Sequence, residues 1–165
     1  MSDTGLKQVL SRLSQNLVRD NIVQEVSRSL RNYLGVDRVV LYYFYQQWEG
    51  QVTFEALSAP EYSLFGSKGP DDCFNGEYAA LYQAGRVSAI EDIETAEIAE
   101  CHRDFLRKLR VRANLVVPVL PPRGLWGLLV AHHCEQARSW SQEDIEQMQQ
   151  GARKLAEAES IMTVS

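Results

Sequence analysis

Two apolar runs in the last third of the chain constrain its fold most strongly. The run "ANLVVPVL" (113–120) and the run "GLWGLLVAHH" (124–133) flank the turn residues of "PPRG". Short runs of this kind, on either side of a turn that contains Pro and Gly, are typical of two antiparallel strands. The sequence therefore predicts a β-hairpin over 113–133 that is buried on at least one face.

A second β-hairpin is predicted nearer the N-terminus. The segment "DRVVLYYFY" (37–45) is rich in β-branched and aromatic side chains. The residues "EG" at 49–50 separate it from the alternating run "QVTFEALS" (51–58). Two such runs joined by a short polar turn indicate a pair of adjacent strands.

The segment between the hairpins is predicted to be irregular at first. Prolines and glycines recur throughout 59–76, which predicts a long loop that carries Cys73. A short helix over 77–84 and a short strand in "RVSAI" (86–90) are expected to follow. A further helix is expected to begin near Cys101, with apolar side chains along one side.

Helices are predicted at both ends of the chain. Apolar residues at helical spacing over 6–34, with a break at "RDN" (19–21), indicate two N-terminal segments. Ser141 and Asp144 resemble a capping box that starts a helix over 141–158. The heptad-like seams of these helices either carry dimer contacts and signals or only pack on the sheet. The element order predicts an α+β fold, a central antiparallel sheet with the terminal helices together on one face.

Composition and charge exclude several classes of protein. The 165 residues fit one domain, taken as 1–165, and 45% of them are hydrophobic, which is ordinary for a globular protein. The net charge of −5, without a basic block, gives no support for binding to nucleic acid or an anionic membrane. No apolar stretch reaches membrane-spanning length, so a cytoplasmic protein is expected. Three cysteines, an odd number, make a disulfide framework a poor explanation.

Cys101 is the first candidate for chemistry. In the first turn of its predicted helix, the unsatisfied N–H groups and the helix dipole favour the thiolate, a usable nucleophile. The alternative is a small buried hydrophobic side chain. Adjacent residues on a helix point about 100° apart, so Cys101 and His102 do not form the nucleophile and base of a hydrolase. The pair could instead flank one extended ligand.

A metal site is the next competitor, and the spacing argues against it. His132 and His133 point to opposite faces of a strand, so at most one of them lies on the same side as Cys134, and no C-x₂-C pair occurs. No metal ligands are therefore assigned. Cys73 follows two aspartates, whose charges should raise its thiol pKa and make it a reluctant nucleophile. Reversible addition remains open to Cys73, as does a loop cysteine without a role.

Four motifs together resemble one known family. They are "DDCF" (71–74), "YQAGRVSAIEDI" (82–93), "ECHRDFLRKLRVRANLVVPVL" (100–120) and "LWGLLVAHHCEQARSW" (125–140). In this order they are similar to the bilin-binding GAF photosensor domains called cyanobacteriochromes, in the dual-cysteine subgroup with an Asp-Xaa-Cys-Phe motif. The resemblance extends from about residue 30 to residue 155. It implies a GAF fold with a bilin pocket on the sheet face opposite the terminal helices.

The resemblance also implies roles for individual residues. Cys101 matches the cysteine that anchors ring A of a linear tetrapyrrole by a thioether, and Cys73 matches the second cysteine, which adds reversibly to the C10 bridge. Asp71 matches the carboxylate that binds pyrrole nitrogens. Further chromophore contacts are expected from Phe74, His102, Tyr82, Asn114 and His132.

The resemblance implies a photoreceptor module rather than an enzyme. Its cofactor would be phycocyanobilin or phycoviolobilin, attached autocatalytically and isomerised between 15Z and 15E by light. Loss of the second thioether would convert a blue-absorbing state into a green-absorbing one. An attached output domain and a homodimer are the expected partners. Two alternatives stay open: a regulatory GAF domain for a small ligand such as a cyclic nucleotide, and a bilin-handling enzyme.

Overall fold

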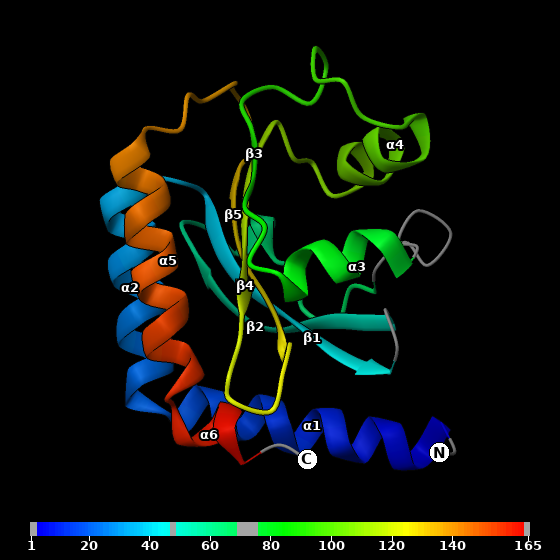
Figure 1. Cartoon of the computed structure of the whole chain (residues 1–165), viewed down its shortest axis with the longest axis vertical. Helices are drawn as coiled ribbons and strands as arrows, with labels where there is room; N and C mark the ends of the chain where they lie inside the picture. The colour runs from blue at the N-terminus through cyan, green and yellow to red at the C-terminus, as the bar shows by residue number, and fades with distance from the viewer. Residues whose placement is uncertain (1–2, 47–48, 69–75, 164–165) are drawn as a thin grey trace.

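The two predicted hairpins join into one antiparallel sheet. The computed structural model describes residues 3–46, 49–68 and 76–163. The sheet order is β2-β1-β5-β4-β3, and every neighbouring pair is antiparallel. The strands are β1 (Arg38–Gln46), β2 (Glu49–Leu57), β3 (Ser88–Ile90), β4 (Ala113–Val119) and β5 (Gly127–His133). The hairpins β1–β2 and β4–β5 meet through β1 and β5, so the most apolar strands lie at the centre (Figure 1).

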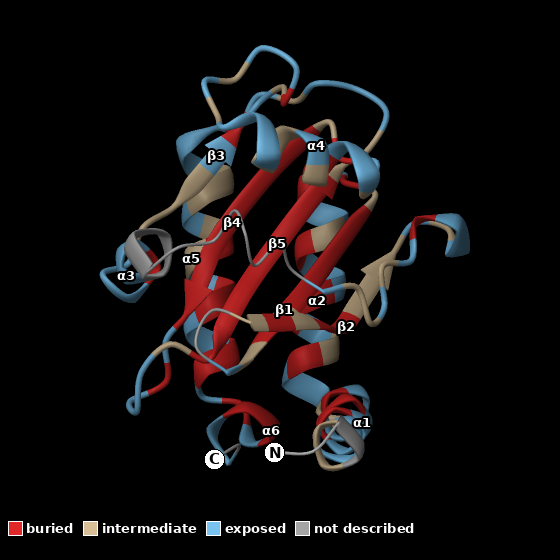
Figure 2. Ribbon diagram, turned by 90° about the vertical axis from the view of Figure 1, so that its right-hand side faces the viewer, coloured by how far each residue is buried: buried red, intermediate tan, exposed pale blue. Residues whose placement is uncertain are grey.

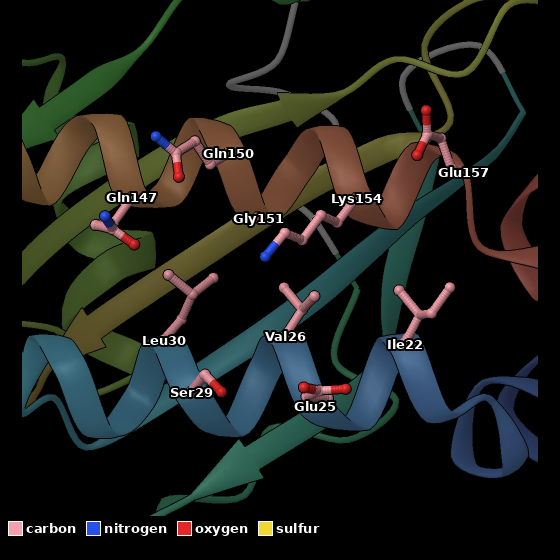
Figure 3. A pocket seen from close by; sticks show the side chains of 10 residues that line it. All are labelled: Ile22, Glu25, Val26, Ser29, Leu30, Gln147, Gln150, Gly151, Lys154 and Glu157. Atoms are coloured by element: carbon pink, nitrogen blue, oxygen red, sulfur yellow. The ribbon is translucent and has the colours of Figure 1, made fainter.

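The helices α2 (Asn21–Leu34) and α5 (Gln142–Ala156) lie side by side on one face of the sheet (Figure 1). The predicted capping box is confirmed, because Ser141 Oγ accepts from the Asp144 amide and Asp144 Oδ2 accepts from the Ser141 amide. The two helices approach closely at Gly151, where a Cβ atom would lie 2.7 Å from Leu30 Cδ1 (Figure 3). At this point the backbone of α5 therefore packs directly against a side chain of α2.

The terminal segments do not all join this layer. The helix α1 (Asp3–Arg19) meets α2 at Asp20 and runs away from the α2–α5 pair along the lower end of the sheet (Figure 1). Asp20 Oδ1 accepts from the amides of Ile22 and Val23 and so caps α2. Its other oxygen, Oδ2, accepts from the amide and hydroxyl of Ser160 in α6 (Glu159–Met162). The helix predicted over 141–158 is α5, which ends at Ala156, and the short helix α6 follows beyond the predicted range.

The opposite face of the sheet is covered by shorter elements. These are α3 (Gly76–Gln83), α4 (Glu100–Lys108) and a 3₁₀ turn, η1 (Pro60–Tyr62). In Figure 1, α3 and α4 lie on the other side of the sheet from α2 and α5. Every element predicted from the sequence is present, and the expected α+β arrangement is confirmed.

Strand alternation sends different side chains to the two faces. In β1, Val39, Leu41 and Tyr43 join the large core under α2 and α5, while Val40 and Tyr42 belong to a smaller cluster under α3 and α4. Both faces of β4 and β5 are buried, as Figure 2 shows. The central hairpin is thus enclosed on both sides, and its second face is available for a site.

Candidate functional site

A pocket lies between the sheet and the α3–α4 side. Its floor is apolar and comes from β1, β2, β4 and β5, and α4 closes it from above. The apolar lining consists of Val40, Tyr42, Val52, Leu64, Tyr82, Phe105, Leu106, Leu109, Val116, Leu128 and Val130. The polar lining residues are Ser67, Lys68, His102, Asn114 and His132. The last three were expected at the site from the sequence. The pocket volume is about 80 Å³.

Ion pairs and hydrogen bonds hold α4 over the pocket. Arg103 Nε donates to the carbonyl of Ile93 at 2.9 Å, and its Nη2 donates to the carbonyl of Ala96. Arg107 forms a two-pronged pair with Glu94, at 2.9 and 2.6 Å. All three acceptor residues lie in the loop between β3 and α4. These contacts fix the direction in which the first turn of α4 faces.

Cys101 lies in the first turn of α4, as predicted. Its side chain is exposed and its sulfur is disulfide-bonded in the structure, so any thioether to a ligand requires prior reduction. Cys101 is beside the pocket and does not line it, whereas the adjacent His102 does. Burial, with a smaller effect of Arg86, lowers the pKa of His102, which favours the neutral imidazole. The divergence of the two neighbours predicted from helix geometry is confirmed.

A row of buried polar residues crosses the sheet under the pocket. Arg38 in β1, His132 in β5 and Asn114 in β4 lie directly opposite one another in the strand register. Their exposed fractions are 1%, 4% and 4%. Arg38 Nε donates to His132 Nδ1 at 2.9 Å, and Asn114 Oδ1 has no hydrogen-bond partner among the described residues. Burial and then the charge of Arg38 hold the pKa of His132 well below its ordinary value.

Other expected site residues fall into two groups. Tyr82 of α3 is buried and lines the pocket, as expected. Asp71, Cys73 and Phe74 lie outside the described residues, so their roles stay predictions. Arg38 was missed by the sequence analysis. The sequence signal that could have indicated Arg38 is a charged residue at the start of an otherwise apolar strand.

The remaining histidine and cysteine lie away from the pocket. His133 faces away from His132, as strand alternation predicted, and its Nδ1 is 3.7 Å from Asp37 Oδ2. Cys134 is a free thiol whose pKa burial raises to about 11. Within the described ranges, no cluster of three His, Cys, Asp or Glu residues is placed to hold a metal ion. Over the same ranges, no helix is long and apolar enough to cross a membrane.

Comparison with protein families agrees with this fold. The model of the GAF domain matches residues 19–158, so the chain belongs to the GAF domain family. An uncharacterized protein of Picosynechococcus sp. is 49% identical over 156 residues, which cover 94% of this chain and 96% of that protein. A putative methyl-accepting chemotaxis protein of Synechocystis sp. is 33% identical over 86% of this chain. Only 14% of that second protein is covered, so the match there is to one part of a longer chain.

Solved structures place the chain among photosensor GAF domains. The blue-light absorbing form of the Thermosynechococcus elongatus PixJ GAF domain superposes with a TM-score of 0.75 at 30% identity, covering 94% of this chain and 87% of that one. A phycocyanobilin-bound GAF domain from a cyanobacterial phytochrome gives a TM-score of 0.72 at 28% identity, with 91% of each chain covered. The structural neighbours of this GAF domain are therefore cyanobacteriochrome and phytochrome domains.

Proposed function

We propose that this chain is a photoreceptor module that binds a linear tetrapyrrole, phycocyanobilin or phycoviolobilin, through a thioether to Cys101. The observation that carries the proposal is the placement of α4. Its first turn carries Cys101 beside the pocket, and the next residue, His102, lines the pocket. A covalent anchor next to a ligand-facing imidazole suits an extended ligand held permanently, which favours a sensor over an enzyme that releases its product.

The pocket chemistry fits a flat, conjugated ligand with polar edges. Valine and leucine side chains of the sheet form a flat apolar floor, which suits the face of a planar ring system. The polar groups include the buried Asn114 Oδ1, which has no hydrogen-bond donor among the described residues. A buried polar atom without a partner is costly, so a ligand N–H group at this place would stabilise the complex.

The tetrapyrrole supplies absorption of visible light and isomerisation about its 15,16 double bond. The residues of the chain would hold it in place and exclude water. Cys101 would anchor one end, while Tyr82 and His102 would contact the pigment from the α3–α4 side. The floor residues Val116 and Val130 would keep the site dry. A dry, closely packed site restricts the motions that a light-driven change can take.

The second part of the proposal concerns Cys73. On the strength of the "DDCF" motif, Cys73 forms a reversible thioether at C10 and Asp71 binds the pyrrole nitrogens. A second thioether shortens the conjugated system, so its presence gives a blue-absorbing state and its absence a green-absorbing one. The expected phenotype of Cys73→Ala is pigment that remains covalently bound but has lost the blue-absorbing state.

The module would act within a larger cytoplasmic signalling protein. Support comes from the chemotaxis relative, whose length far exceeds the matched segment. The layer of α2 and α5 offers a continuous helical surface on the face away from the pocket, suited to an output domain or to a second copy of the chain (Figure 1). Attachment of the bilin would need no other catalyst, and its conversion to phycoviolobilin would occur in the same pocket.

A second candidate is a regulatory GAF domain for a smaller ligand, such as a cyclic nucleotide. The observation that favours it is the pocket volume of about 80 Å³. Pockets for drug-sized ligands span roughly 300–1,000 Å³, so a cavity of this size favours the smaller of the two ligands.

Co-expression with the enzymes of phycocyanobilin synthesis separates these candidates. We expect a coloured protein whose denatured band fluoresces with zinc, and an absorption spectrum that changes reversibly with blue light. Cys101→Ala should lose the fluorescent band, while Cys134→Ala, which alters a free thiol away from the pocket, should keep it. A colourless wild-type chain, purified under reducing conditions, would refute the photoreceptor proposal and leave the small-ligand candidate.

A further inference from the structure

Arg103 lies where the dipole of α4 opposes a positive charge. It stands at the end of the first turn of this helix, which begins at Glu100, and cations are disfavoured near a helix N-terminus. Arginine side chains usually extend into water, yet the side chain of Arg103 is only 15% exposed. The reason for its position should therefore lie in what its guanidinium contacts.

The guanidinium of Arg103 uses all three of its nitrogens. Nε donates to the carbonyl of Ile93 at 2.9 Å, and Nη2 donates to the carbonyl of Ala96. Nη1 pairs with the carboxylate of Glu100, the first residue of α4. Arg103 thus fastens the first turn of α4 to the loop that leads into it.

Ile93 is a fixed point for this attachment. Its side chain is 1% exposed and belongs to an apolar cluster with Ile90 of β3 and Leu106 of α4. Its amide donates to the carbonyl of Arg112, which directly precedes β4, at 2.9 Å. Two hydrogen bonds through Ile93 therefore connect the start of β4 to Arg103.

The first turn of α4 depends on this fastening because its N-cap residue does not hold it. Ala99 occupies the N-cap position and has no side-chain acceptor for the first amides of the helix. Successive residues of a helix point about 100° apart, so a rotation of this turn redirects both Cys101 and His102. The direction of the Cys101 thiol relative to the pocket therefore depends on Arg103.

We propose that Arg103 is a positioning residue for attachment of the pigment, because it holds the first turn of α4 so that the Cys101 thiol faces the reacting carbon. The attachment part rests on the proposed function. In that reaction the S–H group adds across a carbon–carbon double bond of the ring A side chain. A C–S and a C–H bond form, the S–H and π bonds break, and no oxidant or reductant is consumed. The fastening of the turn concerns the protein alone.

The fastening is tested by amide hydrogen exchange on the reduced chain without pigment. The amide of residue 103 donates to the carbonyl of Ala99, so its exchange reports opening of the first turn. We expect Arg103→Met to speed this exchange about tenfold, as loss of one charged hydrogen bond would. The control Lys108→Met removes an exposed cation at the other end of the same helix and should leave the exchange unchanged. Unchanged exchange in Arg103→Met would overturn the fastening.

The positioning role is tested by mixing the reduced chain with phycocyanobilin and following the zinc-fluorescent denatured band over time. The residues that line the pocket are unchanged in Arg103→Met, so we expect the same half-saturating pigment concentration but a maximal rate about tenfold lower. Lys108→Met should match the wild type. Equal maximal rates in the wild type and Arg103→Met would overturn the positioning role. A wild-type chain that attaches no pigment would instead refute the proposed function, and the exchange result would stand.

A double variant separates positioning from simple stabilisation of the helix. In the Arg103→Met background, Ala99→Ser supplies a side-chain cap and should restore slow exchange of the residue 103 amide. The new cap gives no link to Ile93 or Ala96, so the attachment rate should stay low. Recovery of both the exchange and the attachment rate would mean that Arg103 only stabilises the helix.

The variant Arg103→Lys keeps the proposal testable if Arg103→Met does not fold. Lysine retains the positive charge but lacks the planar fork that reaches two carbonyls and a carboxylate together. We expect a maximal attachment rate below that of the wild type. A wild-type rate in Arg103→Lys would show that charge alone is sufficient, and it would overturn the positioning role of the three contacts.

Discussion

The two faces of the central sheet differ in the kind of side chains that they bury. The face under α2 and α5 contributes to an apolar core that includes Leu115, Leu129, Met148 and Leu155, all essentially inaccessible to solvent. The face under α3 and α4 has a smaller apolar cluster and a row of buried polar side chains. One strand serves both, because alternate residues of β5 face opposite ways. A core position and a pocket-lining position are thus adjacent in the sequence.

The largest expected effect comes from the core face. Leu129→Ala removes a fully buried side chain beneath the α2–α5 layer. We expect a loss of about 2–5 kcal/mol in the free energy of unfolding, from lost burial and the cavity that remains. Leu128→Ala, its neighbour on the pocket face, should cost about half as much, because that site already borders a pocket. Urea unfolding of both variants measures the difference, and equal losses would contradict the distinction between the faces.

The second largest expected effect is a loss of stability at low pH, and it comes from the pocket face. Burial and Arg38 lower the pKa of His132 from the ordinary value of 6.5. Below about pH 6.5 the unfolded chain takes up a proton that the folded chain refuses, so the free energy of unfolding falls as pH falls. The slope from this residue reaches at most about 1.4 kcal/mol per pH unit.

The variant His132→Gln provides the control for this pH dependence. Urea unfolding from about pH 7 to about pH 5 should show a shallower fall in stability for His132→Gln than for the wild type. Burial also lowers the pKa of His102, so His102 contributes to the pH dependence of stability in both proteins. Parallel curves for the two proteins would mean that His132 titrates normally in the folded chain.

The smallest expected effects concern helix caps, which differ between the faces. The helix α5 has a complete capping box at Ser141, whereas Ala99 gives α4 no side-chain cap. Ser141→Ala should lower the free energy of unfolding by about 1 kcal/mol, and Ala99→Ser should raise it by at most a similar amount. Thermal and urea unfolding report both changes. A loss of stability in Ala99→Ser would show that the start of α4 needs its present geometry.

Much of this architecture could be predicted from local patterns. The alternation in "GLLVAHH" separates His132 from His133, and the spacing in α4 turns His102 toward the pocket while Cys101 stays outside its lining. These features depend on one element at a time. The role of Arg38 could not be found in this way, because its contact with His132 joins residues 94 positions apart. Only the β1–β5 pairing places them together.

Chain reversals were the other feature that local patterns left open. Arg110 follows α4 with φ 61°, in the left-handed region that a glycine would usually occupy. No sequence signal marks Arg110 for that conformation. The end of α5 at Ala156 also lacks a Gly or Pro signal, and the helical spacing of apolar residues continues beyond it. Tertiary contacts, including the Asp20–Ser160 hydrogen bonds, accompany this change of direction.

The side chain of Asp20 has a consequence for the local opening of the molecule. One of its oxygens caps α2, and the other holds α6, so a single carboxylate serves segments 140 positions apart. When α6 detaches, the carboxylate loses one set of donors and is free to rotate away from the other. The amide hydrogens of Ile22 and Ser160 should therefore exchange with solvent in the same opening events.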